Sequence, residues 1–269
     1  MLKGYVNASG FPLQIAVAHA VTSTTSSHGW KERFHEHAWH HPTSDRTGFI
    51  DLVIVNRHET AALVVECKRT MDSHWVFLKD VATQDDCKRT KCFVLHKNGV
   101  ETKRFSWVDL AVQPQTFESE FCVVRGTGNG NDKNLVTLLE RVGSELVISS
   151  ESLAIEDKRL SLDDRWKLLV YFNVIVTTAT LHVCSIEASD ISLKDGTVDE
   201  VDLQQVPYVR FRKQLNAMYN VPDVFRVAGD CDVAAAKEST VFVVNSMHLI
   251  DFLEAFEIEN GFPNAHYLA

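Results

Sequence analysis

Residues 48–70 read GFIDLVIVNRHETAALVVECKRT, two apolar runs joined by a polar turn. Branched apolar residues at this density, bounded by turn residues, predict a β-hairpin. The runs nevertheless carry ionised side chains, Asp51 in the first and Glu66 and Lys68 in the second. Burying an unpaired charge is costly, so these residues need a physical reason to be there.

A tight turn at positions 58 and 59 would place Asp51 opposite Glu66. Because side chains alternate along a strand, Asp51, Glu66 and Lys68 are then expected on one face, and moving the turn by one position preserves this. Two opposed carboxylates repel each other, so the arrangement requires a compensating cation. Lys68 supplies part of it. Mg²⁺ suits the remainder, because it takes hard oxygen ligands and binds through one or two carboxylates plus phosphate oxygens.

An Asp on one strand and Glu-x-Lys on the next, IDLVIV and VVECKR, resembles the PD-(D/E)XK nuclease superfamily, which has the restriction-endonuclease-like fold. The resemblance covers roughly the first hundred residues, and its motif is short. It implies that Asp51 and Glu66 are metal ligands and that the backbone carbonyl of Cys67 is a further one. Lys68 would orient or activate the hydrolytic water. The implied cofactor is Mg²⁺, with Mn²⁺ able to substitute.

Two positions depart from the family pattern. Ile50 stands where the name-giving proline would be. Members often carry a further acid on the preceding helix, but the helix predicted at 12–21, PLQIAVAHAV, has only Gln14 and a histidine to offer. We therefore expect Glu36 to be the auxiliary catalytic acid, with Glu32 as the alternative.

The rest of the chain mixes apolar runs with amphipathic segments, which predicts an α/β protein. We expect a restriction-endonuclease-like central mixed sheet flanked by helices, with additional C-terminal α/β elements. Residues 1–125 would form the nuclease core and 126–269 an elaboration packed on it, and a single domain stays open. Expected strands lie at 30–39, 91–97, 120–126 (buried), 166–186 (one or two), 206–215 and 239–246. Expected helices lie at 75–89, 134–147 and 247–258.

Composition narrows the class of protein. The 269 residues are 45% hydrophobic, enough for a sizeable core, and the net charge of −9 argues against a surface that coats nucleic acid indiscriminately. The clusters CKRTK, ETKRF and RFRKQ are usually solvated, yet they are the candidates for gripping a nucleic-acid backbone. Six cysteines without a Cys-x-x-Cys pair indicate reduced thiols. No apolar run is long enough for a membrane span, and no cleaved signal is expected, which favours a cytoplasmic protein.

Two further features of the sequence could indicate a ligand-binding site. The histidines at 28, 35, 37, 40 and 41 could suggest zinc, but Trp39 occupies the second histidine position of His-Glu-x-x-His. We expect them to line the mouth of the site or to be solvated. The loop GTGNGNDK, 126–133, lacks the Gly-Lys-Ser/Thr ending of a P-loop, so a flexible loop that caps the next helix is favoured over a phosphate cradle.

The set Asp51, Glu66, Lys68 and Glu36, taken with the family resemblance, predicts a Mg²⁺-dependent endonuclease that hydrolyses phosphodiester bonds. DNA is the preferred substrate, and RNA is left open. By the resemblance, it would serve as a bacterial restriction or phage-defence effector, as a homodimer or with a partner subunit of a defence complex. The alternative is a catalytically inactive nuclease-fold module that binds nucleic acid or a protein. A plainer alternative is an ion-pair cluster on an edge hairpin, where charges prevent edge-to-edge pairing.

Overall fold

The computed structural model describes residues 2–70, 72–81, 87–98, 102–125, 138–160, 168–215 and 237–259. Within these ranges the larger of two sheets has ten strands, in the order β1-β2-β3-β9-β13-β12-β7, with β5 joined to β9, β6 to β5 and β14 to β6. The strands are β1 (Lys31–His41), β2 (Arg46–Val55), β3 (Ala61–Lys68), β5 (Cys87–Asn98), β6 (Thr102–Thr116), β7 (Glu118–Ser119), β9 (Leu168–Thr177), β12 (Tyr208–Gln214), β13 (Glu238–Asn245) and β14 (Glu257–Ile258).

The centre of this sheet is parallel, because β3 and β13 both run parallel to β9. Parallel strands are covered on both faces, which explains why β3 and β9 read as continuous runs of buried residues rather than as alternating ones. The chain from residue 168 onward thus supplies β9, β12 and β13 to the same sheet as β1, β2 and β3.

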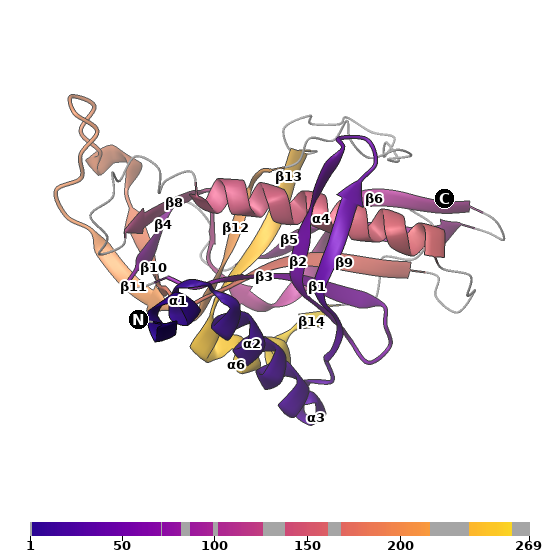
Figure 1. Ribbon diagram of the computed structural model, residues 1–269. Helices are drawn as coiled ribbons and strands as arrows, with labels where there is room; N and C mark the ends of the chain where they lie inside the picture. Colours follow the sequence, from indigo (N-terminus) through magenta and orange to yellow (C-terminus); the bar gives the residue numbers. More distant parts are fainter. Residues whose placement is uncertain are drawn as a thin grey trace.

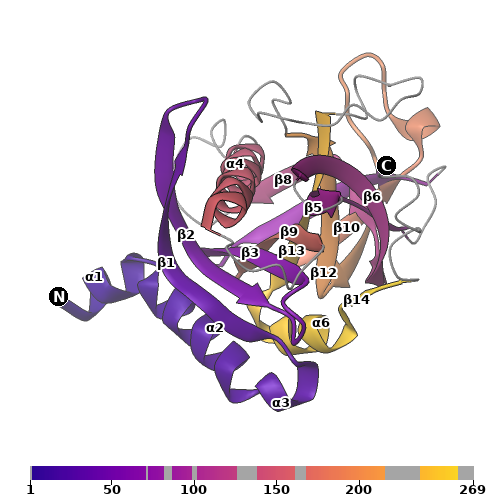
Figure 2. The same ribbon diagram turned by 90° about the vertical axis from the view of Figure 1, so that its right-hand side faces the viewer.

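Helices cover both faces of the large sheet (Figures 1 and 2). On one side α4 packs on an apolar cluster that includes Val53, Val64 and Leu146, here called the α4-side cluster. On the other side α2 and α6 pack on a cluster that includes Val17 and Leu52, here called the α2-side cluster. The helices are α1 (Leu2–Ala8), α2 (Phe11–Ser23), α3 (Thr25–His28), α4 (Leu138–Leu160) and α6 (Leu249–Ala255), with short 3₁₀ turns at Ala188–Asp190 and Ser246–His248.

A second, four-stranded sheet has the order β11-β10-β4-β8 and lies beside the end of α4 (Figure 1). Its strands are β4 (His74–Asp80), β8 (Phe121–Arg125), β10 (Thr180–Ile186) and β11 (Asp202–Val206). The helix predicted at 75–89 is therefore wrong. Trp75, Phe77 and Lys79 are buried while their neighbours are not, and this period of two is that of a strand.

Most of the other predicted elements are confirmed. The helix at 12–21 is α2, with a proline in its first turn, and the irregular strand at 30–39 is β1. The segment 166–186 forms two strands, and 247–258 forms a short helix between a 3₁₀ turn and β14. The strand at 120–126 is only half buried, since Phe121 and Val123 are exposed. The helix at 134–147 is seen from Leu138 and continues to Leu160, while the 126–133 loop and its cap lie outside the described residues.

The chain is thus a mixed α/β protein with a large mixed sheet flanked by helices, as the sequence predicts at this level. No helix in the described ranges is both long and apolar enough to cross a membrane.

Candidate active site

The hairpin of β2 and β3 has the register expected from the sequence. Val55 pairs with Ala62 and Leu52 with Val65, and the ladder ends there, one residue before the expected pair of Asp51 and Glu66. The turn closes without an Asn-Gly pair, because the N–H of Glu59 donates to the carbonyl of Asn56 and Glu59 takes a φ of 55°.

The two strands stop pairing at Leu52 and Val65, so Asp51 lies where β2 leaves β3. Across this opening, Oδ2 of Asp51 accepts a 2.7 Å hydrogen bond from the backbone N–H of Cys67. Strict alternation is interrupted here, since Ile50 and Val53 both belong to the α4-side cluster. The carboxylate reaches β3 by turning across the gap, and not by the simple alternation that the sequence suggests.

Glu66 and Lys68 lie two residues apart on β3 and form an ion pair with a distance of 2.6 Å from Nζ to Oε1. Their side chains are 22% and 34% exposed, so solvent and a ligand can reach both. The Coulomb attraction of this pair is screened by water, which leaves both groups available for other partners.

Glu36 on β1 is a third acidic residue close to Asp51. It lies between His35, paired with Leu52, and His37, paired with Ile50, and is therefore opposite Asp51. Its φ of 52° is rare for a residue that is not glycine and marks an irregularity in the strand. Glu36 thus adds a third carboxylate beside the opening between β2 and β3.

Gln14 on α2 connects Glu36 to Asp51. Its Nε2 donates to Oε1 of Glu36 and, at 3.0 Å, to the backbone carbonyl of Asp51. The side chain of Gln14 is almost fully buried, whereas its partner Glu36 is exposed, so both hydrogen bonds are partly buried. The sequence shows Gln14 only as the place of a missing acid. Its role as a link depends on the tertiary packing of α2 against β1 and β2.

The pKa of Asp51 is raised to about 6, first by burial and then by the negative charge of Glu66. The N–H of Cys67 and the ammonium of Lys68 lower it, and Glu36 raises it further. The pKa of Asp51 is thus shifted by the same four residues that lie around it, which are Glu36, Glu66, Cys67 and Lys68. A cation added to this group of carboxylates would stabilise its ionised form.

The donors here suit a hard cation. Asp51 keeps Oδ1 free of the bond to Cys67, Glu36 keeps Oε2 free of the bond to Gln14, and Glu66 is partly exposed. Mg²⁺ is held by one or two carboxylates, with water completing its shell, which these oxygens can supply. Across the described ranges, no three His, Cys, Asp or Glu side chains form a ready-made metal-binding group.

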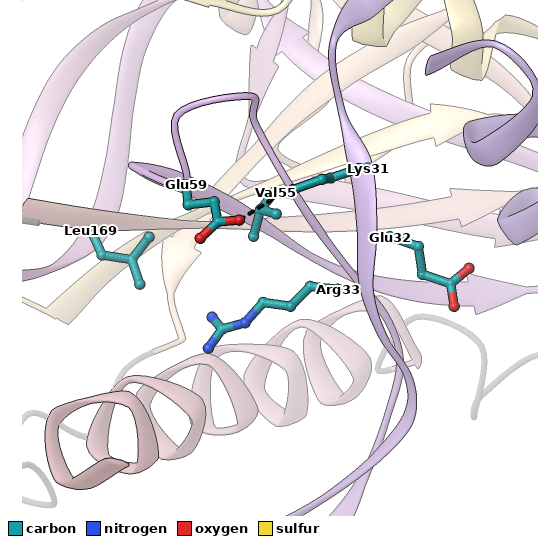
Figure 3. Close-up of a pocket in the computed structure, with 6 residues that line it drawn as sticks. All are labelled: Lys31, Glu32, Arg33, Val55, Glu59 and Leu169. Atoms are coloured by element: carbon teal, nitrogen blue, oxygen red, sulfur yellow. Dashed lines mark hydrogen bonds and ion pairs between the residues drawn. The ribbon is translucent and has the colours of Figure 1, made fainter. Parts of the chain in front are cut away.

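Glu32, the alternative auxiliary acid, lies elsewhere. It pairs with Ile54, three residues along β2 from Asp51. It lines a pocket of about 290 Å³ with Lys31, Arg33, Val55, Glu59 and Leu169 (Figure 3). In that view the Lys31–Glu59 ion pair joins the start of β1 to the turn between β2 and β3, and Glu32 points away from it.

Four of the five histidines, His28, His37, His40 and His41, have partners within the protein. His37 bonds to Glu156 at 2.8 Å and His40 to Asp45 at 3.0 Å. His41 is fully buried, with Nε2 3.7 Å from a carboxylate oxygen of Glu151. His28 accepts the N–H of Trp30, and His35 is exposed. Of these five, His35 and His37 flank Glu36 in sequence and are the closest along the chain to the opening.

The basic clusters are largely occupied within the protein. Arg89, Lys91 and Arg212 all pair with Asp109. Arg210, in the cluster RFRKQ, is fully buried, so this arginine cannot grip a nucleic-acid backbone. The side chains of the charged residues in ETKRF lie outside the described part of the structure.

The described cysteines are free thiols, as expected, and Cys231 lies outside the described residues. Cys67 packs in the α2-side cluster, where burial raises the pKa of its thiol. A buried thiol of this kind is a poor nucleophile, so the contribution of Cys67 to the site comes from its backbone.

Comparison of the chain with protein-family models, with curated proteins and with solved structures gives no match.

Proposed function

We propose that the protein is a metal-dependent endonuclease that hydrolyses phosphodiester bonds at the opening between β2 and β3. The main support is the hydrogen bond from the backbone N–H of Cys67 to Asp51. It holds the Asp51 carboxylate against β3, at the residue between Glu66 and Lys68. The raised pKa of Asp51, caused first by burial and then by the charge of Glu66, supports the proposal, because a divalent cation at this carboxylate would offset both effects.

Asp51 and Glu66 would hold Mg²⁺, or Mn²⁺ in its place, with the carbonyl of Cys67 as a further ligand. When bound, the ion polarises the phosphate and lowers the pKa of a coordinated water. Lys68 Nζ, now paired with Glu66 at 2.6 Å, would donate to the attacked phosphate and stabilise the negative charge that develops on it. Glu36, held by Gln14, would serve as the auxiliary acid with its free oxygen.

The proposed substrate is nucleic acid, DNA by preference. The proposed setting is a bacterial restriction or phage-defence effector, acting as a homodimer or with a partner subunit, and the support for it is the sequence resemblance alone. The finer fold assignment, a restriction-endonuclease-like core at 1–125 with an elaboration at 126–269, is part of the same proposal.

The test is incubation of the purified chain with plasmid DNA and single-stranded oligonucleotides, in Mg²⁺, Mn²⁺ or EDTA. We expect cleavage with either metal, none in EDTA and none with Asp51→Asn or Lys68→Ala. Asp251→Asn, which changes an exposed carboxylate on α6, is the matched control and should cut like the wild type. Tight binding without cleavage in either metal would overturn the proposal in favour of the non-catalytic module.

A further inference from the structure

The strands β1 and β2 continue together beyond the point where β3 ends its pairing. β2 pairs with β3 only from Leu52 to Val55, whereas the β1–β2 ladder runs on to the pair His41 and Arg46. Residues 36–41 and 46–51 thus form a two-stranded extension, here called the arm, which lies alongside α4 (Figure 2). The Asp51 opening lies at the base of the arm.

One face of the arm is covered by α4. Trp39 and Ile50 are buried on that face, and His37 bonds to Glu156 of α4. Within the arm, Gly48 lies against the ring of Trp39, its cross-strand neighbour. The burial of Trp39 and Ile50 and the bond of His37 to Glu156 hold the arm against the body of the protein.

The other face of the arm is open. Ala38, His40, Thr47 and Phe49 alternate with the covered residues, and all four are exposed. Phe49 is 64% exposed and lies directly opposite Ala38, whose methyl group covers little of the ring. A single exposed apolar residue is ordinary on a protein surface, but this one is an aromatic ring next to a proposed phosphodiester site.

Phe49 is close to the proposed reacting centre. Phe49 and Asp51 flank the covered residue Ile50, which places them two residues apart, about 7 Å along a strand. This is within the span of one nucleotide. A base attached to a phosphate at the opening could therefore lie on the ring of Phe49.

We propose that Phe49 is a stacking platform for an unpaired base, and hence that the substrate is single-stranded nucleic acid. This inference rests on the proposed function and names its substrate class. Bases within a duplex are already stacked on both faces, whereas bases of a single strand are free to stack on an aromatic side chain. The ring of Phe49 thus has no partner in an intact duplex.

The electrostatics favour the same substrate. A duplex is gripped through many phosphate contacts, and the chain has a net charge of −9. The cations Arg89, Lys91 and Arg212 are already paired with one carboxylate, that of Asp109. Stacking adds affinity beyond that of phosphate contacts, which helps a chain of net negative charge to hold a single strand.

The test measures binding in EDTA, where cleavage does not interfere. Fluorescence anisotropy compares the affinity for a single-stranded oligonucleotide, as DNA and as RNA, with that for the duplex of the same sequence. We expect tighter binding of the single strand, and Phe49→Ala should weaken it by roughly 5- to 150-fold. Phe49→Trp should retain the affinity and show fluorescence quenching on binding, which a purely structural role would not produce.

Phe121→Ala is the matched control, because Phe121 is 56% exposed but belongs to the four-stranded sheet. It should bind like the wild type. Equal affinities of wild type and Phe49→Ala, or a preference for the duplex, would overturn the inference, as would no binding of the single strand. If Phe49→Ala binds the single strand more weakly but the wild type does not cleave in Mg²⁺, the inference stands and the proposed function fails. Cleavage by the wild type with no effect of Phe49→Ala would do the reverse.

Discussion

The carboxylate of Asp51 accepts a 2.7 Å hydrogen bond from the backbone N–H of Cys67, across the gap where β2 leaves β3. Cys67 lies between Glu66 and Lys68 in sequence, so this bond fixes the position of Asp51 relative to both. It also favours the ionised form of Asp51, against the larger effects of burial and of Glu66. The site is therefore held together by backbone geometry while its carboxylates repel each other.

The first prediction concerns the stability of Asp51→Asn as a function of pH. The folded pKa of Asp51, about 6, lies above its ordinary value of 3.8, so the folded state binds this proton more tightly than the unfolded state does. The resulting stabilisation is present at low pH and is lost as the pH rises through about 6. Above pH 6, Asp51→Asn should therefore raise the free energy of unfolding by ~1–2 kcal/mol, and by less towards pH 4.

Urea denaturation in EDTA at pH 5 and pH 8 measures this difference. Repeating the pH 8 measurement in Mg²⁺ should stabilise the wild type and leave Asp51→Asn unchanged, because a ligand that binds only the folded state adds to its stability. A variant that is less stable than the wild type at pH 8 in EDTA would contradict the raised pKa.

The second prediction separates catalysis from ion pairing at Lys68. If the proposed function holds, Lys68→Ala should lower the rate of phosphodiester cleavage by about 10² or more, because it removes the donor that would stabilise charge developing on the phosphate. Its effect on the free energy of unfolding should stay below ~1 kcal/mol, since the pair with Glu66 is partly exposed. The matched control is Lys31→Ala, which removes another 2.6 Å ion pair, with Glu59, at the pocket of Figure 3. Equal loss of activity in both variants would argue against a role for Lys68 in the reaction.

The register of the β2–β3 hairpin could be predicted from the sequence, because the apolar runs and the short polar turn between them leave few ways to pair. The turn itself has no strong signature, and moving it by one position would shift the pairing by two residues, so that only the common face of Asp51, Glu66 and Lys68 would be kept. The pairing of Leu52 with Val65 confirms the register expected for a turn at positions 58 and 59.

Other features depend on contacts between distant segments, which local patterns do not contain. A helix is predicted at 75–89, but Trp75, Val76 and Phe77 favour a strand, and β4 pairs on one side with β10 and on the other with β8. Gln14 links Glu36 to Asp51 only because α2 packs across β1 and β2. The alternation of side chains along β2 is likewise interrupted at Asp51 because pairing with β3 stops there. The sequence pattern alone does not contain this information.

The third prediction concerns Arg210, a fully buried guanidinium between β12 and the β5–β6 pair. All five of its N–H donors are used: they donate to the hydroxyls of Thr90 and Thr116 and to the carbonyls of Lys88, Val112 and Pro114. Burial lowers its pKa to about 10, which still leaves it charged at neutral pH. Arg210→Met would remove all five of these hydrogen bonds, and among the acceptors the Lys88 carbonyl would keep the hydroxyl of Thr90 as a donor.

We expect Arg210→Met to lower the free energy of unfolding by ~3–5 kcal/mol, as measured by urea denaturation. Arg46→Met removes a 43% exposed arginine, 3.8 Å from Glu145, and should change it by less than ~1 kcal/mol. Similar effects of the two substitutions would mean that the acceptors around Arg210 find other partners.

The last prediction concerns Gly48, which leaves room for the ring of Trp39 on the neighbouring strand of the arm. A Cβ at position 48 would lie 2.9 Å from Cζ2 of Trp39, closer than real Cβ contacts, and the buried indole has little room to move. Gly48→Ala should therefore lower the free energy of unfolding by ~1–3 kcal/mol. Gly4→Ala is the control: position 4 is on α1 with no atom within 4 Å of the new methyl group, so alanine should be neutral or stabilise by up to ~1 kcal/mol. Because Gly48 adjoins Phe49, the same substitution should also weaken single-strand binding. An unchanged urea midpoint for Gly48→Ala would show that the Trp39 ring moves freely to make room for the added methyl group.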